Sequence, residues 1–227
     1  MPEIFKEYAL IVAGGSGSRI KSEVPKQFLE IGALPVLMHT CAAFYRYTES
    51  INIILVLPPD QISFWESLCV KYDFLIPHIV VEGGSTRQQS VKNGLNKIDD
   101  EGFVAIHDGV RPFVSVNLIK SGFATARKYG NAVAAISLKD SLRYIASKKN
   151  ISVNRADYRL VQTPQTFSNS IIRKAYELCK EDFTDDASVA ENAGHDITLI
   201  EGNYSNFKIT TSEDLIYAEA MIRRSEL

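Results

Sequence analysis

The feature that most constrains this chain is an alternation of short apolar runs with longer segments whose apolar residues follow helical spacing. The short runs are rich in Val and Ile and lack the polar–apolar alternation of a half-exposed strand, so they predict buried strands. These runs are residues 8–12, 53–57, 78–81, 103–107 and 132–136. The helical segments are residues 35–47, 61–72, 86–98 and 116–129. Such alternation predicts an α/β, Rossmann-like fold, in which a mostly parallel sheet is flanked by helices on both faces.

Two polar residues are candidate caps for the predicted helices. Asp60 is predicted to cap the second helix, and Ser85 forms a capping-box pattern with Gln88 before the third. In sheets of this kind, ligands bind beyond the carboxyl ends of the strands, where the strand order reverses. The loops that follow the strands are therefore the predicted location of the chemistry.

The segment from residue 139 to residue 165 breaks the alternation, because it contains no good helical pattern. Two short strands are predicted at 142–145 and 151–153, on either side of a polar turn. An excursion of this length from an α/β core is often an arm that packs on another subunit, so we expect a β-arm over residues 139–160 that serves in dimerisation. A surface hairpin is the alternative. Beyond it, helices are predicted at 168–180, 187–192 and 211–224, and strands at 197–201 and 207–210.

The bulk properties favour a single globular domain over residues 1–227. The 227 residues are 45% hydrophobic, which suffices for a substantial core. The net charge of −2 gives no overall basic field for nucleic acid, and no apolar run approaches the roughly 20 residues that span a bilayer. Neither nucleic acid nor a membrane is therefore an expected partner. Three cysteines without metal or disulfide spacing fit a reducing, cytoplasmic location.

A glycine-rich loop follows directly on the first predicted strand. It reads Ala13-Gly14-Gly15-Ser16-Gly17-Ser18-Arg19, and its glycines let backbone amides approach an anion closely. It is not a Walker loop, because Lys-Ser or Lys-Thr does not follow the last glycine. It is a poor dinucleotide fingerprint as well, since Ile20 stands where the third glycine belongs. Alone, the loop predicts no more than a nearby phosphate.

The continuation of this loop supplies two cations at a defined spacing. Arg19 is followed after five residues by Pro25-Lys26, which completes the pattern G-G-x-G-x-R-x5-P-K. Arginine offers a planar fork for phosphate oxygens and lysine a mobile point charge. Pro25 also restricts the backbone before the lysine. We therefore predict that Arg19 and Lys26 are catalytic and activate a nucleoside triphosphate, the alternative being a turn with two solvated cations.

Two further loops at strand ends carry polar residues. Gly83-Gly84 and Ser90 belong to a segment that opens a helix, where backbone amides either face a polar ligand or simply form an N-cap. Asp108 follows the fourth strand, where it can bind ribose hydroxyls or a metal, directly or through water. Arg111 lies three residues on, so a structural ion pair with Asp108 is the alternative. The adjacent His107 is predicted to be structural rather than a general base.

The remaining candidates lie in the second half of the chain. Ser141 opens the predicted arm and Arg155 closes it, although locally Arg155 reads as an ordinary exposed arginine. Thr163 stands in a Gln-Thr-Pro-Gln stretch, and Thr184-Asp185 precedes a helix that either residue can cap. Lys208 is a cation inside a predicted apolar strand, so it needs an anionic partner.

Together these motifs resemble the cytidylyltransferases that act on 2-C-methyl-D-erythritol 4-phosphate, a family of sugar and polyol phosphate nucleotidyltransferases. The resemblance covers about residues 8–221. It implies transfer of CMP from CTP to the acceptor phosphate, giving 4-diphosphocytidyl-2-C-methyl-D-erythritol and pyrophosphate for non-mevalonate isoprenoid synthesis. It also implies Mg²⁺ or another divalent metal as the cofactor, and a homodimer that exchanges its arms.

The resemblance implies a role for each candidate residue. The residues that it assigns to nucleotide binding are Ala13, Gly14, Gly15, Gly17, Gly83, Gly84, Ser90 and Asp108, the last also as a metal ligand. Those that it assigns to positioning the polyol phosphate acceptor are Ser141, Arg155, Lys208, Arg111, Thr163 and Thr184. Two positions depart from the family pattern, because Ser85 stands in place of Asp and Ser141 in place of Thr.

Two alternative functions remain open at this point. Ribitol-5-phosphate cytidylyltransferase shares the fold and similar motifs, and anion-binding residues cannot separate two polyol phosphate acceptors. The other alternative is a non-catalytic nucleotide-binding module. A binding module has no need of three separated phosphate cations, which Arg19, Lys26 and Lys208 provide.

Overall fold

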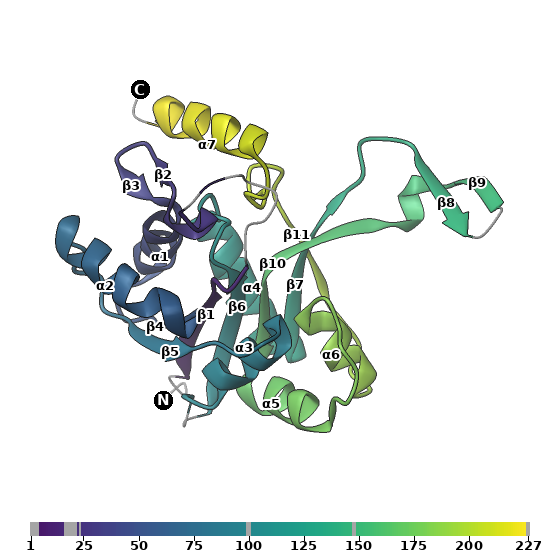
Figure 1. The fold of residues 1–227 in the computed structure, drawn as a ribbon. Helices are drawn as coiled ribbons and strands as arrows, with labels where there is room; N and C mark the ends of the chain where they lie inside the picture. Colours follow the sequence, from purple (N-terminus) through teal and green to yellow (C-terminus); the bar gives the residue numbers. More distant parts are fainter. Residues whose placement is uncertain (1–4, 16–21, 23, 99–100, 147–148, 226–227) are drawn as a thin grey trace.

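A seven-stranded sheet forms the centre of the molecule (Figure 1). The computed structural model describes residues 5–225 except 16–21, 23, 99–100 and 147–148. The strands, in spatial order, are β11 (Leu199–Glu201), β7 (Asn131–Ser137), β10 (Arg159–Ser168), β6 (Gly102–Asp108), β1 (Lys6–Val12), β4 (Asn52–Leu57) and β5 (Ile79–Glu82). Within this sheet only β10 runs antiparallel to its neighbours. The predicted α/β fold with a mostly parallel sheet is therefore confirmed.

Helices cover both faces of this sheet (Figure 1). They are α1 (Val36–Tyr47), α2 (Ile62–Lys71), α3 (Arg87–Leu95), α4 (Val116–Tyr129), α5 (Asn169–Leu178), α6 (Asp186–Asn192) and α7 (Ser212–Ser225). Along β1, Ala9 and Ile11 belong to one core cluster with residues of α1, α2 and α4, whereas Leu10 and Val12 belong to another with residues of α3, α5 and α6. Successive side chains of a strand point to opposite faces, so burial on both faces explains the continuous apolar runs. None of these helices, within the residues described, is both long and apolar enough to cross a membrane.

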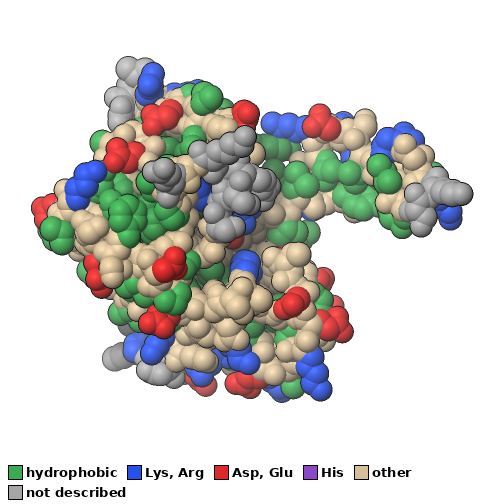
Figure 2. Space-filling view, in the orientation of Figure 1, with side chains coloured by type: hydrophobic (Ala, Val, Ile, Leu, Met, Phe, Trp, Pro, Cys, Tyr) green, Lys and Arg blue, Asp and Glu red, His purple; other side chains and the backbone are tan. Residues whose placement is uncertain are grey.

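Two small sheets lie outside the central one. The short β2 (Glu30–Ile31) pairs with β3 (Leu34–Pro35), and β8 (Leu142–Ala146) pairs with β9 (Lys149–Val153). As predicted, an arm projects from the body of the molecule between β7 and β10, and the β8–β9 hairpin forms its tip (Figure 1). Figure 2 shows hydrophobic side chains along the visible side of this arm. Among its exposed apolar residues are Tyr144, Ile145 and Ile151.

Both predicted helix caps are wrong in detail. Asp60 lies in a single 3-10 turn, η2 (Pro59–Gln61), and the residue before α2 is Gln61, which makes no side-chain cap bond. The turn displaces Asp60 from the position where its carboxylate would face the first helical amides. At α3 the cap is Thr86 rather than Ser85, because its hydroxyl accepts a hydrogen bond from the Gln89 amide. Ahead of α6, Asp185 serves as the cap, one of the two predicted possibilities.

Two strand predictions also need correction. No strand forms at 207–210, because this segment is tied to a loop and to α7: the Ile209 amide bonds to the Val110 carbonyl, and Asp214 of α7 accepts the Thr210 amide. Conversely, β10 was not predicted as a strand. Its central residues are buried but polar, and its pairing register with β7 shifts between Val161 and Gln165, so it lacks an apolar signature.

Candidate active site

The carboxyl ends of three central strands meet at one edge of the sheet. Val12, the last residue of β1, pairs with Val56 of β4 on one side and with Asp108, the last residue of β6, on the other. The strand order therefore reverses at β1, which is the place where α/β sheets bind ligands. Two adjoining cavities lie here, of about 230 and 420 Å³. Three side chains line both of them, those of Arg87, Asp108 and Lys208.

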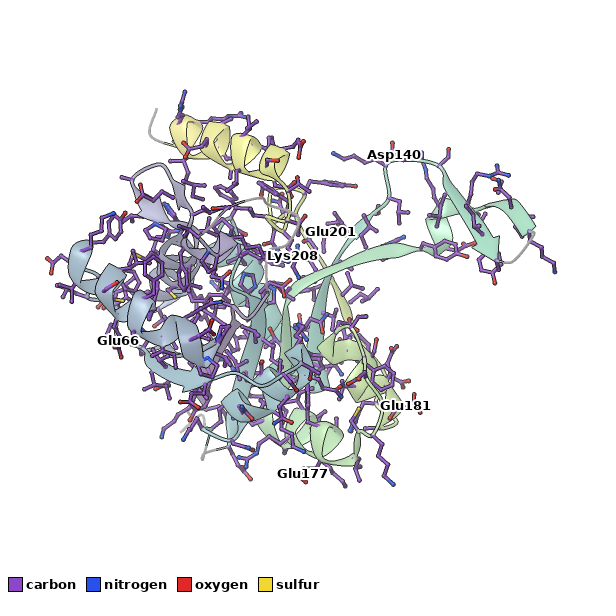
Figure 3. All side chains as sticks on the ribbon, in the orientation of Figure 1. Glu66, Asp140, Glu177, Glu181, Glu201 and Lys208 are labelled. Carbon is purple, nitrogen blue, oxygen red and sulfur yellow. The ribbon has the colours of Figure 1, made fainter. Side chains whose placement is uncertain are left out.

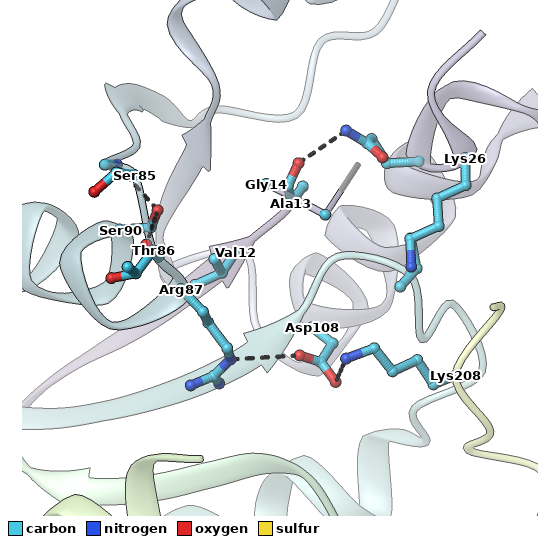
Figure 4. A pocket seen from close by; sticks show the side chains of 14 residues that line it. Val12, Ala13, Gly14, Lys26, Ser85, Thr86, Arg87, Ser90, Asp108 and Lys208 are labelled. Atoms are coloured by element: carbon cyan, nitrogen blue, oxygen red, sulfur yellow. Dashed lines mark hydrogen bonds and ion pairs between the residues drawn. The ribbon is translucent and has the colours of Figure 1, made fainter. Parts of the chain in front are cut away.

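The loop after β1 forms one wall of the first cavity. Its residues Ala13, Gly14 and Gly15 line the cavity together with Lys26, which begins a buried 3-10 turn, η1 (Lys26–Phe28). A Cβ added to Gly15 would lie 3.4 Å from the Lys26 Cε atom, so the lysine side chain extends along the glycine backbone. The neighbouring Gln27 donates a hydrogen bond of 2.9 Å to the Ala13 carbonyl and holds the loop in place (Figure 4).

The loop after β5 forms the opposite wall of this cavity. The Ser90 hydroxyl accepts a bond from the Gly84 amide and donates one to the Thr86 carbonyl, at 3.0 and 2.9 Å. The Gly83 amide bonds to the Leu57 carbonyl of β4. A side chain at Gly84 would clash, since its Cβ would lie 2.1 Å from Gln89 Cγ. Gly84 and Ser90 line the cavity, whereas Gly83 does not, so the structure brings two of these three predicted residues to the cavity of Lys26.

Asp108 is surrounded by cations. Its Oδ2 atom lies 3.0 Å from Arg111 Nε and 3.1 Å from Lys208 Nζ, and its Oδ1 atom lies 3.9 Å from Arg87 Nε. Burial would raise the pKa of Asp108, but Lys208, Arg111 and Arg87 outweigh it and hold the pKa well below its usual range. The carboxylate is therefore ionised, and the anionic partner that Lys208 was predicted to need is Asp108.

The second cavity is lined by polar side chains from β10 and the loop before α6. It holds Arg111, Thr163 and Thr184, all predicted to face the acceptor. The Thr163 hydroxyl accepts a hydrogen bond of 3.0 Å from the Asp108 amide, which couples this cavity to the first. The Thr163 carbonyl in turn accepts a bond from the buried Asn206. The two cavities therefore share one wall, which includes Asp108.

His107 is buried and lines neither cavity. Its Nε2 atom lies 3.1 Å from the Arg111 carbonyl oxygen, and its ring packs edge-on against Phe44. Desolvation lowers the pKa of His107 to about 4, so the ring is neutral at physiological pH. This geometry supports the prediction of a structural residue and gives no path for proton transfer to a ligand.

The donor set fits a metal that a ligand carries rather than one that the protein holds alone. Among the described residues, no three His, Cys, Asp or Glu side chains gather as a metal site. Asp108 is the one described carboxylate that lines the first cavity, and the ion pair described at its Oδ1 atom is the one with Arg87, at 3.9 Å. Mg²⁺ commonly binds through one or two carboxylates together with substrate phosphates. Asp108 meets that requirement.

The arm residues are not brought to either cavity of their own chain. Ser141 and Arg155 are exposed, and Arg155 donates a hydrogen bond to the Lys139 carbonyl at the base of the arm. Figure 3 shows Asp140, next to Ser141, on the arm well away from Lys208 at the sheet edge. Two other predicted site residues, Gly17 and Arg19, lie outside the described residues.

Sequence reasoning missed Arg87, which lines both cavities. It opens α3 directly after the Gly83-Gly84 segment, and an arginine in the first turn of a helix at a strand's carboxyl end was the available signal. Reasoning also missed Gln27, whose role as a brace for Ala13 depends on a contact between segments that spacing alone does not show.

Comparison with known proteins shows the family of this chain. The family model described as "IspD: 2-C-methyl-D-erythritol 4-phosphate cytidylyltransferase" matches residues 8–224. A protein of that name from Azobacteroides pseudotrichonymphae genomovar. CFP2 is 50% identical over 219 residues, covering 96% of this chain and 99% of the relative. Another from Bacteroides fragilis is 48% identical over 215 residues, covering 94% and 98%. The crystal structure of 4-diphosphocytidyl-2C-methyl-D-erythritol synthase from Anaerococcus prevotii DSM 20548 has a TM-score of 0.83 and 33% identity, covering 97% of each chain.

Proposed function

The chain belongs to the 2-C-methyl-D-erythritol 4-phosphate cytidylyltransferase family, and we propose from its geometry how the residues at the sheet edge divide the work. The enzyme transfers CMP from CTP to 2-C-methyl-D-erythritol 4-phosphate, which yields 4-diphosphocytidyl-2-C-methyl-D-erythritol and pyrophosphate in the non-mevalonate route to isoprenoids. The observation that carries the division of work is the pair of cavities that share Arg87, Asp108 and Lys208. One cavity suits the nucleotide and the other the acceptor.

The reaction joins two anions. A phosphate oxygen of the acceptor attacks the α-phosphorus of CTP, the new P–O bond forms, and the bond to the pyrophosphate leaving group breaks. A phosphate monoester is already largely ionised at neutral pH, so positioning and charge neutralisation carry the rate, without a strong general base. The buried, neutral His107 agrees with this requirement.

Lys26 and Arg19 are proposed to stabilise charge on the α-phosphate in the transition state. Lys26 is buried in the nucleotide cavity and lies along Gly15, which supports the role, while Arg19 rests on the resemblance and its spacing. The backbone of Gly14, Gly15 and Gly84, which lines the same cavity, is proposed to contact the nucleotide, and Asp108 is suited to its ribose.

The acceptor phosphate is proposed to bind in the second cavity. Lys208 and Arg111 supply positive charge there, and Thr163 and Thr184 supply hydroxyl groups. Both cations already contact Asp108. The cluster still carries more positive than negative charge, so it would attract an acceptor anion.

Mg²⁺ or another divalent metal is proposed as the cofactor. Asp108 would hold it together with the triphosphate oxygens, which matches the single carboxylate that the nucleotide cavity presents among its described residues. Bound there, a divalent metal neutralises phosphate charge and assists the departure of pyrophosphate.

A homodimer with exchanged arms is proposed as the assembly. Ser141 and Arg155 are assigned to the acceptor by the resemblance, yet both lie on the exposed arm. The exposed apolar residues of the arm, Tyr144, Ile145 and Ile151, support burial against a second copy.

We also propose a cytoplasmic location, which the free thiols of Cys41, Cys69 and Cys179 support.

The experiment that tests the function measures pyrophosphate release from CTP with either of two acceptors. We expect turnover with 2-C-methyl-D-erythritol 4-phosphate and at most trace turnover with ribitol 5-phosphate. Equal or faster turnover with ribitol 5-phosphate would reassign the acceptor, and no release with either would refute the transferase role. Omitting the divalent metal, with a chelator present, is expected to abolish release.

A further inference from the structure

Arg87 occupies a special position, because it stands on the wall between the nucleotide and acceptor cavities. Its side chain is 26% exposed. Its Nη1 and Nη2 atoms donate to both oxygens of Asp186, at 2.9 and 2.7 Å, while its Nε atom lies 3.9 Å from Asp108 Oδ1. A distance of 3.9 Å is too long for a hydrogen bond. The end-on pair with Asp186 therefore leaves the Nε edge of the guanidinium toward the cavities (Figure 4).

The pair is held from behind by a buried tyrosine. Asp186 begins α6 and is fully buried, and the Tyr176 hydroxyl of α5 donates to its Oδ1 atom at 2.6 Å. Burial raises the pKa of Tyr176 far above its usual value, and the Asp186 carboxylate raises it further, so the phenol remains a donor. Tyr176 and Asp186 thus link α5 and α6 to the guanidinium at the start of α3.

Arg87 is paired closely with Asp186 and lies 3.9 Å from Asp108. Desolvation would lower the pKa of Arg87, but the Asp186 carboxylate outweighs it and raises the pKa, so the guanidinium stays charged. The short ion pairs of Asp108 are made by Arg111 and Lys208, while Arg87 makes its own short ion pair with Asp186. The Nε edge is left available to an oxygen acceptor that enters between the cavities.

A similar triad at the other end of the sheet serves as an internal comparison. Tyr47 donates to Glu7 Oε1 at 3.1 Å, and Arg127 pairs with the same oxygen. Glu7 belongs to the amino-terminal part of β1, so this triad lies away from both cavities. Its arginine side chain is 43% exposed, and its carboxylate is not fully buried. An arginine, a carboxylate and a tyrosine therefore meet both at the site and remote from it.

We propose that Tyr176 and Asp186 form a buried support that fixes Arg87 between the two cavities, where its Nε edge binds a phosphate oxygen of CTP next to the acceptor. This inference rests on the proposed placement of CTP in the cavity of Lys26. Arg87 contacts substrate in this scheme, whereas Asp186 and Tyr176 are positioning residues. A guanidinium whose fork is already oriented loses little conformational freedom when it binds a phosphate.

The test compares Arg87→Lys, Tyr176→Phe and the matched control Tyr47→Phe with the wild-type enzyme. Calorimetric titration with CTP and Mg²⁺ gives the Kd without turnover, and pyrophosphate release gives kcat. For Arg87→Lys, which keeps the charge but loses the fork, we expect the Kd of CTP to rise about tenfold and kcat to fall about 100-fold. For Tyr176→Phe we expect kcat to fall about tenfold, since the fork is misplaced but present.

Tyr47→Phe removes the equivalent hydroxyl from the remote triad and is expected to leave both Kd and kcat unchanged. Circular dichroism and thermal unfolding report the fold of every variant. Wild-type kcat and Kd in Arg87→Lys, or equal kcat in the two tyrosine variants, would overturn the proposal. An inactive wild type would instead refute the proposed function, and the Kd of CTP for Arg87→Lys would still decide whether Arg87 binds the nucleotide.

Discussion

The sheet edge and the arm of this chain hold their predicted functional residues in opposite ways. At the edge, Lys26 and Asp108 are buried, and Asp108 lies between cations of its own chain. On the arm, Ser141 and Arg155 are exposed, and Arg155 donates to nearby backbone. Preorganised groups need a rigid frame that locks their orientation. The residues proposed for the nucleotide are therefore held in a rigid frame within one chain, whereas the two arm residues are exposed and lie outside both cavities.

The largest loss of activity is expected from replacing Lys26, the buried lysine at the sheet edge. Lys26→Ala should lower kcat on the order of 10²–10³-fold, because a preorganised donor to the transition state is lost. Steady-state pyrophosphate release measures the loss, and circular dichroism checks that the fold survives. Lys120→Ala, at an exposed position on α4, is the matched control and should retain full activity. Near-normal turnover in Lys26→Ala would show that Lys26 has no role in the reaction.

A smaller and more selective effect is expected on the arm. Arg155→Ala should raise the KM for the acceptor about tenfold or more, because one charge-assisted contact to its phosphate is lost, while the KM for CTP stays unchanged. Arg143→Ala changes another exposed arginine of the arm and should leave both constants alone. If Arg155→Ala raised only the KM for CTP, the arm would not belong to the acceptor half.

The pH dependence of stability tests how deeply the sheet edge is buried. Burial lowers the pKa of His107 to about 4 in the folded chain, against about 6.5 when unfolded. Between these values the unfolded state binds more protons, so acidification from pH 6.5 to 4 should lower the free energy of unfolding by on the order of 3 kcal/mol. His107→Gln should lack this component in urea titrations at each pH. An identical pH slope in both proteins would show that His107 is not desolvated as described.

The sequence predicts the features of the fold that depend on local patterns, and it does not predict those that depend on contacts between distant segments. The strands of the central sheet were predictable because runs such as Leu10 to Val12 are buried on both faces and therefore apolar throughout. The strand β10 was not, since Gln162, Thr163 and Gln165 are buried polar residues whose hydrogen-bond partners lie elsewhere in the fold.

The same distinction holds at the candidate site. Lys26 and the glycines before it are close in sequence, so their spacing alone predicts a phosphate loop. Arg87 is held by Asp186, which lies 99 residues further along the chain and is itself bound by Tyr176, and no local pattern encodes these contacts. Lys208 was identified through its need for an anion, yet the strand assumed around it is absent, and only the fold shows Asp108 as its partner.

The most direct test of the exchanged arm combines the Lys26→Ala and Arg155→Ala variants in one dimer. Lys26→Ala and Arg155→Ala subunits are dissociated together, reassociated in equal amounts and assayed at limiting acceptor. If the arm crosses between subunits, random pairing makes half of the dimers hybrids, each with one intact site, so activity should recover to about a quarter of the wild-type value. Activity no greater than the mean of the two separate variants would contradict an exchanged arm and would place the whole site within a single chain.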